Sequence, residues 1–254
     1  TNIGDLMSLI IPANSAAAGG YAVDNSCRFN DDDSPNMQKT ISTTGNRKTA
    51  TFSTWMKRSK LGEQWFLNMG GNYSTGYNTK IGFDSDDRIF IIDASSGTNL
   101  RLQCTQSFRD TSAWYNFIVV FDTTQGTASN RVKFFVNGSQ VTSFATETYP
   151  DENEDLQFNL NTSSKNLAVV GSRLNNVADN FDGYLAETVW IDGTAYGADS
   201  FGEFDEDSGI WKPINVSGLT FGTNGFYLDF EDSANLGNDA NGGTDLTESG
   251  LAAI

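Results

Sequence analysis

Three carboxylates stand at alternate positions in the segment Glu203-Phe204-Asp205-Glu206-Asp207. Alternate side chains of a strand share one face, so such a triplet can aim its acids into one cleft. Two carboxylates about 5–5.5 Å apart serve as nucleophile and acid/base in retaining glycoside hydrolysis. Here Glu206 is charged where a residue facing the core is needed, and Gly202 and Gly209 flank the segment as turn residues. We interpret the segment as a solvated acidic turn and keep glycoside hydrolysis as a remote alternative.

The chain of 254 residues contains no histidine. This excludes Ser-His-Asp and Cys-His catalysis, imidazole zinc sites and histidine acid–base chemistry. The formal net charge is −16, which would repel the phosphates of nucleic acid. The sequence also has no apolar run of about 18 residues, so we expect no membrane span. We therefore predict a protein that is not an enzyme and binds neither nucleic acid nor the bilayer core.

Short apolar runs separated by turn residues predict the elements. Phe117–Phe121 is continuously apolar, as is typical of a strand buried on both faces. Asn137-Gly138 lies between two such runs and predicts a type I′ hairpin turn. The other predicted strands are Thr49–Lys57, Lys80–Phe83, Arg88–Ile92, Arg131–Val136, Ser139–Val141, Leu167–Val170, Gly183–Ile191 and Phe226–Phe230, with a short helical turn within Tyr196–Phe204. This pattern predicts an all-β fold, a two-sheet antiparallel sandwich.

The two cysteines and Glu187 lead to separate predictions. Cys27 and Cys104 lie in strand-like runs, and we favour two buried thiols, with a disulfide as the alternative. Glu187 shares a period-two face with Leu185, Val189 and Ile191, which predicts a carboxylate among apolar neighbours. We expect a structural role for Glu187, satisfied by loop N–H groups, with a ligand or catalytic role as the alternative.

Residues 1–25 read as an extended N-terminal arm, since Ala16-Ala17-Ala18-Gly19-Gly20 is a flexible spacer. We predict that residues 26–254 form one sandwich whose C-terminal strand completes the sheet. An apolar arm of this kind can dock on a neighbouring protein or pack on its own domain.

Four segments, in this order, resemble the landmarks of laminin-G-like domains in the concanavalin A-like lectin/glucanase group. The segments are Ser26–Asp33, Thr51–Lys57, Trp114–Asp122 with Val132–Gly138, and Phe181–Glu187. The resemblance implies a concanavalin A-like jelly roll. It also implies one Ca²⁺ at a rim of the sandwich, because such domains often hold one and hard cations take carboxylate and carbonyl oxygens. The candidate calcium ligands are Asp31, Asp32, Asp33, Asn180, Asp182 and Asp239.

Sugar binding requires an exposed aromatic ring beside polar groups at a loop rim. The candidates are Trp65, Tyr73, Tyr77 and Trp211. By contrast, Trp55, Trp114 and Trp190 lie in strand-like runs, so we expect them in the core.

Four further segments resemble a branch of this group found in structural proteins of tailed bacteriophages. They are Phe108–Tyr115, Asp122–Gln125, Ser200–Glu203 and Gly209–Pro213. The resemblance implies a virion component on the surface of the capsid or tail, either a capsid decoration or a tail-fibre module. Its implied partners are other virion proteins through the arm, copies of itself in a homo-oligomer, and host-surface glycans. The alternative is a free calcium-dependent lectin.

Overall fold

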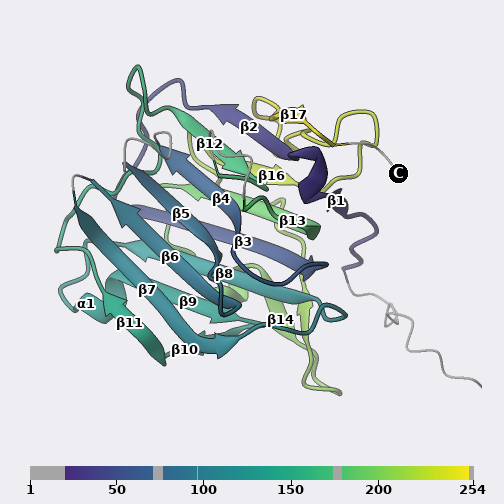
Figure 1. The fold of residues 1–254 in the computed structure, drawn as a ribbon, viewed down its shortest axis with the longest axis horizontal. Helices are drawn as coiled ribbons and strands as arrows, with labels where there is room; N and C mark the ends of the chain where they lie inside the picture. The colour runs from purple at the N-terminus through teal and green to yellow at the C-terminus, as the bar shows by residue number, and fades with distance from the viewer. Residues whose placement is uncertain (1–20, 71–76, 96, 174–178, 252–254) are drawn as a thin grey trace, which may run out of the picture.

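A computed structural model describes residues 21–70, 77–95, 97–173 and 179–251. Nearly all of its regular structure is antiparallel β-sheet (Figure 1). Its helical elements are single turns, namely η1 (Asp31–Asp33), α1 (Ala128–Arg131) and η3 (Ala198–Ser200). Within the described ranges, no helix is both long enough and apolar enough to span a bilayer.

Two large sheets account for most strands of the described residues. The seven-stranded sheet runs β1 (Cys27–Phe29), β13 (Gly183–Asp192), β3 (Thr49–Arg58), β8 (Tyr115–Asp122), β9 (Val132–Val136) and β10 (Ser139–Val141), with β16 (Phe226–Leu228) paired to β13. The eight-stranded sheet runs β11 (Phe144–Thr148), β7 (Thr98–Ser107), β6 (Arg88–Ala94), β5 (Asn78–Phe83), β4 (Gln64–Gly70), β12 (Leu167–Val170), β2 (Asn36–Thr40) and β17 (Thr247–Ser249). A small hairpin, β14 (Gly202–Phe204) with β15 (Trp211–Pro213), stands apart.

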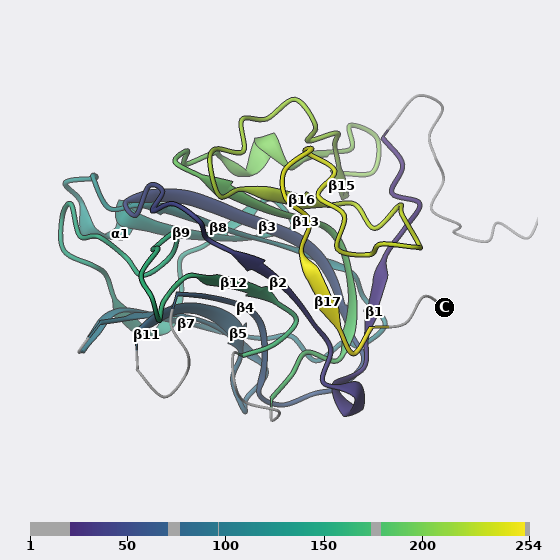
Figure 2. The same ribbon diagram turned by 90° about the horizontal axis from the view of Figure 1, so that it is seen from above.

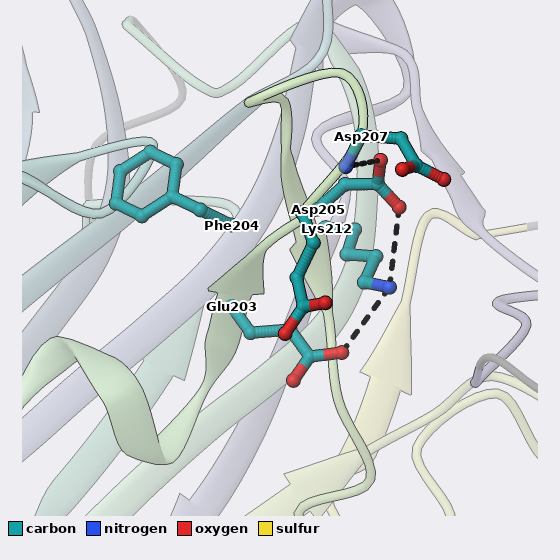
Figure 3. Close-up of a pocket in the computed structure, with 6 residues that line it drawn as sticks. Glu203, Phe204, Asp205, Asp207 and Lys212 are labelled. Atoms are coloured by element: carbon teal, nitrogen blue, oxygen red, sulfur yellow. Dashed lines mark hydrogen bonds and ion pairs between the residues drawn. The ribbon is translucent and has the colours of Figure 1, made fainter.

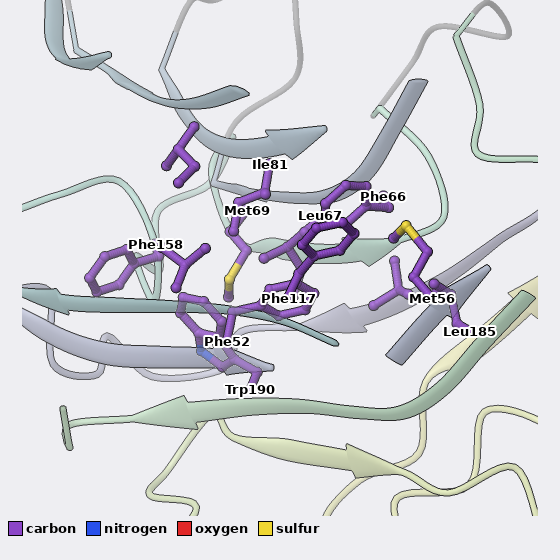
Figure 4. Close-up of a cluster of buried hydrophobic side chains, with 14 of the residues drawn as sticks. Phe52, Met56, Phe66, Leu67, Met69, Ile81, Phe117, Phe158, Leu185 and Trp190 are labelled. Atoms are coloured by element: carbon purple, nitrogen blue, oxygen red, sulfur yellow. The ribbon is translucent and has the colours of Figure 1, made fainter. Parts of the chain in front are cut away.

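The two sheets pack face to face, so the predicted sandwich is confirmed (Figure 2). Their inner faces meet through aromatic side chains (Figure 4). The Phe66 ring, from β4, lies 6.1 Å from the ring of Phe52 and 6.4 Å from that of Phe117, both from the other sheet. Burying such rings is the main favourable term for a fold with so little helix, at roughly 25 cal/mol per Å² of apolar surface.

A second core lies on the outer side of the seven-stranded sheet. Ile118 and Val120 of β8 face it, while Phe117, Val119 and Phe121 face the inner core. The segment from η3 to β16 covers this side (Figure 2) and contributes Phe201, Trp211 and Phe221, among others, to the second core. The prediction that Phe117–Phe121 is buried on both faces is therefore confirmed.

The predicted turn at Asn137-Gly138 is confirmed by its backbone angles. Asn137 has φ of 47° and Gly138 has φ of 75°, the left-handed values that a type I′ turn requires. The turn joins β9 to β10, with Val136 opposite Ser139. Between β5 and β6, the N–H of Asp87 donates to the carbonyl of Asp84 at 3.0 Å and closes the turn formed by residues 84–87.

The expected period-two face of β13 is wrong. Its register against β3 shifts between Ala186 and Val189, and Glu187 adopts φ of 47°. A β-bulge of this kind adds one residue and reverses the faces beyond it. Leu185 therefore belongs to the inner core, whereas Val189 and Ile191 belong to the second core.

Several elements differ from the sequence prediction. The helical turn η3 lies inside the predicted range, but Gly202–Phe204 is a strand. Trp190 is fully buried and Trp55 packs against the second core, as expected, whereas Trp114 is 38% exposed just before β8. The C-terminal strands join both sheets, since β16 pairs with β13 and β17 pairs with β2.

The two cysteines are buried and unpaired, so the expectation of two thiols is confirmed. Burial raises the pKa of Cys27 to about 12 and that of Cys104 to about 11. Neither sulfur is therefore a ready nucleophile.

Candidate functional site

The outer face of the eight-stranded sheet carries a row of side chains that crosses four adjacent strands. Arg101 pairs with Ile92, Ile92 with Lys80, and Lys80 with Asn68. Directly opposed residues of antiparallel strands point to the same side of a sheet. The sequence neighbours of these residues, such as Leu100, belong to the inner core. We call this the cation row; it lies on the outer face of the eight-stranded sheet, whose strands β4 to β7 are nearest the viewer in Figure 1.

A second row runs beside it and consists of Gln103, Phe90, Gly82 and Trp65. The indole of Trp65 lies flat over Gly82, where a Cβ would be only 2.7 Å from the Trp65 Cε3 atom. The ring centroids of Trp65 and Phe90 are 6.0 Å apart. The absence of a side chain at Gly82 thus lets the two rings approach across β5. We call the cation row and this aromatic row together the outer patch.

The cations of the outer patch rest on its rings. The Lys80 Nζ atom lies 4.6 Å from the Trp65 ring centroid, and the Arg101 guanidinium carbon lies 4.7 Å from the Phe90 centroid. Such contacts contribute about 0.5–2 kcal/mol each and fix where the charges stand. Burial, together with the nearby Arg173, lowers the pKa of Lys80 to about 8.

Asn68 closes the cation row, and within the described residues its side-chain amide has no hydrogen-bond partner. The residue is fully buried, and neither its Oδ1 nor its Nδ2 atom is bonded there. An unsatisfied buried polar group costs about 1–3 kcal/mol, so native proteins keep few of them.

The aromatic residues predicted for sugar binding do not form one site. Trp65 is only 3% exposed and Trp211 only 8%, so the prediction that their rings are exposed is wrong. Trp211 packs on Gly138 and Gly202 under the β14–β15 hairpin, and its Nε1 donates to Asn116 Oδ1 at 2.9 Å.

Tyr77 is half-buried, and the Lys165 Nζ atom lies 3.3 Å from its ring centroid. Tyr73 lies outside the described residues. Of the four candidates, Trp65 alone among those described belongs to the outer patch. Whether any of them binds sugar stays a prediction.

Two of the predicted calcium ligands come together at the edge near η1. Asp31 and Asp182 lie close enough to affect each other's pKa, with Lys60 paired to Asp31 and Arg28 Nη2 lying 2.8 Å from Asp182 Oδ1. Burial would raise the pKa of Asp31, but the hydrogen bond from Lys60 and the neighbouring Asp182 lower it. Burial and the neighbouring Asp31 raise the pKa of Asp182. Lys60 and Arg28 thus supply the positive charge that a metal ion would bring.

The other predicted ligands have different partners. Asp239 is buried and pairs with Lys39 Nζ at 2.9 Å, so it belongs to another cluster. Asn180 accepts from the Ser172 hydroxyl at 2.8 Å, while Asp32 and Asp33 are exposed in η1. In the described part of the chain, no three His, Cys, Asp or Glu side chains gather in an arrangement that could hold a metal. Calcium binding stays a prediction.

The acidic segment considered for glycoside hydrolysis forms a shallow hollow of about 300 Å³ on the β14–β15 hairpin (Figure 3). Lys212 Nζ lies 3.2 Å from Glu203 Oε1 and 3.4 Å from Asp205 Oδ2, while Phe204 points away from them. Hydrogen bonds from Ser208 and Lys212 lower the pKa of Asp205 to about 2. A glycosidase acid needs a raised pKa, so this arrangement does not favour hydrolysis.

Glu187 is held by tyrosine hydroxyls rather than by loop N–H groups, which corrects the sequence expectation. Tyr227 donates to Glu187 Oε2 at 2.6 Å, and Tyr21 donates to the same oxygen at 3.0 Å. Burial raises the pKa of Glu187, although the two hydroxyls oppose the shift. Tyr21 thereby ties the described end of the predicted arm to the bulge of β13. The two hydroxyl groups that donate to Glu187 both come from this chain, which fits a structural role for Glu187.

The sequence analysis did not identify most residues of the outer patch as candidate site residues. Lys80 and Phe90 lay in predicted strands, but nothing in a single strand shows which residues of β4, β5, β6 and β7 stand side by side. Register across four strands is a property of the folded sheet. The one usable signal was Gly82 within an apolar strand, which indicates a close approach by another group.

Comparison with known proteins gives the class of the protein. Residues 31–196 match the model of the concanavalin A-like lectin/glucanases superfamily, of the laminin G type. The chain belongs to this superfamily. Its fold is the antiparallel jelly roll of lectin-like and laminin-G-like domains. No curated protein matches the sequence.

Several solved structures are similar to this chain. A heptameric SAP-like pentraxin from Limulus polyphemus is 13% identical, with a TM-score of 0.46 and 92% of each chain covered. Domain 4 of the extracellular arabinanase AbnA from Geobacillus stearothermophilus is 14% identical, with a TM-score of 0.47, covering 67% of this chain and 72% of that one. Domains LG4-5 of the mouse laminin alpha1 chain are 8% identical, with a TM-score of 0.46, covering 82% of this chain and 48% of that one. These likenesses are too distant to bear on function.

Proposed function

We propose that this protein is a non-catalytic glycan-binding module whose binding surface is the outer patch. The observation that carries the proposal is Arg101, whose exposed guanidinium lies over the Phe90 ring, with its central carbon 4.7 Å from the ring centroid, on the outer face of the eight-stranded sheet. Saccharides are dense in hydroxyl groups, whose oxygens accept hydrogen bonds from guanidinium N–H groups.

A glycan microarray with the full-length protein tests this proposal. The wild type binds at least one class of glycan, and Arg101→Ala loses that binding without losing thermal stability, because Arg101 is exposed. Gln140→Ala is the matched control, since Gln140 is exposed on β10 of the other sheet. Equal binding by wild type and Arg101→Ala would contradict the outer patch as the site. A blank array would contradict glycan binding.

A structural role in a tailed-phage virion is a second proposal, and the β14–β15 hairpin favours it. Phe204 is 51% exposed and Ile210 is 66% exposed, on either side of the acidic turn. Exposed apolar side chains on a projecting element suit contact with another protein. The proposed partners are other virion proteins, contacted through the N-terminal arm, and copies of this chain.

Cryo-electron microscopy of the particle tests the virion proposal. Density for the sandwich on the capsid lattice would support a decoration role, and density at the tail would support host recognition. If the particle lacks this chain, the virion proposal is wrong, and a free lectin, with or without calcium, becomes the proposed function.

A further inference from the structure

The chain contains three Asn-Gly pairs, which begin at Asn137, Asn224 and Asn241. Asparagine is a chemically labile residue. It reacts most readily before glycine, because glycine has no Cβ atom to keep its main-chain nitrogen away from the side-chain carbonyl of the asparagine. Burial and hydrogen bonds of the asparagine amide oppose this reaction, since the amide must first come free by local opening. The surroundings of each pair therefore decide which one reacts.

The fold holds the first two asparagines in place. Asn137 is half-buried, and its Oδ1 atom accepts the Asn116 N–H at 2.7 Å. Asn224 is 3% exposed, and its Nδ2 atom donates to the Thr43 carbonyl at 3.1 Å and to Asp192 Oδ2 at 2.9 Å. Each side chain must break these bonds before its Cγ atom can turn toward the next main-chain nitrogen.

The third pair lies in an exposed turn. Asn241, Gly242 and Gly243 are all exposed, and within the described residues the Asn241 side-chain amide has no hydrogen-bond partner. Gly242 has φ of 81°, and its N–H donates to the Asp239 carbonyl at 2.7 Å. This bond closes the surface turn of residues 239–242. Local opening of a surface turn costs much less free energy than opening of a strand within a sheet.

We propose that Asn241 is a site of spontaneous deamidation. The Gly242 main-chain nitrogen gives up its proton to solvent and attacks the Asn241 Cγ atom, which expels ammonia and closes a cyclic succinimide. Water then opens the ring at either carbonyl and leaves aspartate or isoaspartate at this position. In sum, one side-chain amide and one water become one carboxylic acid and one ammonia, so the reaction needs no oxidant or reductant.

The product alters a contact between the two sheets. The Asn241 N–H donates to Asp239 Oδ1 at 3.2 Å, and the same oxygen accepts the Tyr227 N–H of β16 at 3.0 Å. The other oxygen, Oδ2, pairs with Lys39 of β2 at 2.9 Å. Isoaspartate adds a methylene to the main chain of the turn, and either product adds a negative charge beside Asp239. Deamidation therefore displaces the carboxylate that links β16 to β2 and lowers the melting temperature.

Peptide mapping by mass spectrometry tests the proposal during incubation of the full-length protein at mildly alkaline pH. The same incubation in urea gives the rate of each pair without the fold. We expect Asn241 to keep most of its unfolded rate, whereas folding slows Asn137 and Asn224 roughly 10-fold or more, because their hydrogen bonds must break first. Asn241→Gln is the matched control, because its longer side chain closes the equivalent ring far more slowly. We expect incubation to lower the melting temperature of the wild type and not that of Asn241→Gln.

Two outcomes would overturn the proposal in different ways. If folding slows Asn241 as much as Asn137, the Gly242 hydrogen bond protects the turn and the assignment of the site is wrong. If Asn241 is converted but the melting temperature of the wild type stays constant, the site is correct and its effect on the contact between the sheets is wrong.

Discussion

Asp93 makes the stability of the sandwich depend on pH in an unusual direction. Its side chain is fully buried, with Oδ2 accepting the Gln157 N–H at 2.7 Å and the Thr79 hydroxyl, while Oδ1 has no partner in the described part of the chain. Burial raises the pKa of Asp93 to about 6, although both hydrogen bonds and the charge of Arg47 oppose the shift. The folded state therefore binds this proton more tightly than the unfolded state, whose pKa is about 3.9.

The sign and the size of the effect follow from linkage. The contribution of Asp93 to stability is complete below about pH 4 and is lost as the pH rises through about 6. A shift of about two units corresponds to about 3 kcal/mol in all. About 1.4 kcal/mol of this separates about pH 8 from about pH 5, because the proton is mostly bound to the folded state at the lower value.

Asp93→Asn keeps an acceptor for Gln157 and Thr79 and cannot ionise. Urea unfolding followed by tryptophan fluorescence gives the free energy of unfolding of wild type and variant at each pH. We expect the wild type to gain about 1.4 kcal/mol relative to Asp93→Asn between about pH 8 and about pH 5. Asp151→Asn, in an exposed loop, is the control and shows no such gain. Parallel wild-type and Asp93→Asn curves would refute the reasoning.

Three other predictions concern the outer patch, the hairpin and the calcium expectation. Gly82→Ala lowers the free energy of unfolding by roughly 1–3 kcal/mol in urea titration, because its Cβ would meet the Trp65 ring at 2.7 Å and the Gln64 carbonyl oxygen at 2.4 Å; an unchanged midpoint would contradict the stacking of Trp65 on Gly82. Trp211→Phe leaves Asn116 Oδ1 without its indole donor and costs about 1–3 kcal/mol in the same assay, and a loss below a few tenths would mean that the bond is dispensable. If calcium binds at Asp31 and Asp182, added Ca²⁺ raises the melting temperature and Asp182→Asn removes that rise; identical melting in Ca²⁺ and in chelator would end the calcium hypothesis.

The sequence was sufficient to predict the two-sheet sandwich, but not the register between its strands. The Asn137-Gly138 turn was predictable because only a left-handed pair of residues closes a two-residue hairpin with the right twist. Strand β4 was missed because a bulge between Trp65 and Leu67 breaks the period-two alternation on which strand prediction depends. By contrast, β13 was predicted as a strand, but the bulge at Glu187 reverses the faces of the residues beyond it.

The functional residues were harder still, because burial decides what an aromatic side chain can do. The sequence predicted an exposed Trp65 and a buried Trp114, yet Trp65 lies under Lys80 and Trp114 is exposed. Likewise, Asp31 and Asp239 are both turn acids in the sequence, but one joins Lys60 and the other a buried pair with Lys39. Such partners come from strands that lie far away along the chain, so no local pattern identifies them.

Each of the two large sheets contains one buried thiol, and the reactivity of that thiol reports on local opening of its strand. Cys27 is on β1 of the seven-stranded sheet, and Cys104 is on β7 of the eight-stranded sheet. Because only an exposed thiolate alkylates quickly, each sulfur reacts at the rate at which its own strand opens. The alkylation rates of Cys27 and Cys104 can be measured separately by mass spectrometry. Equal rates would mean that the two sheets open together, and unequal rates would mean that one strand opens locally while the other sheet stays folded.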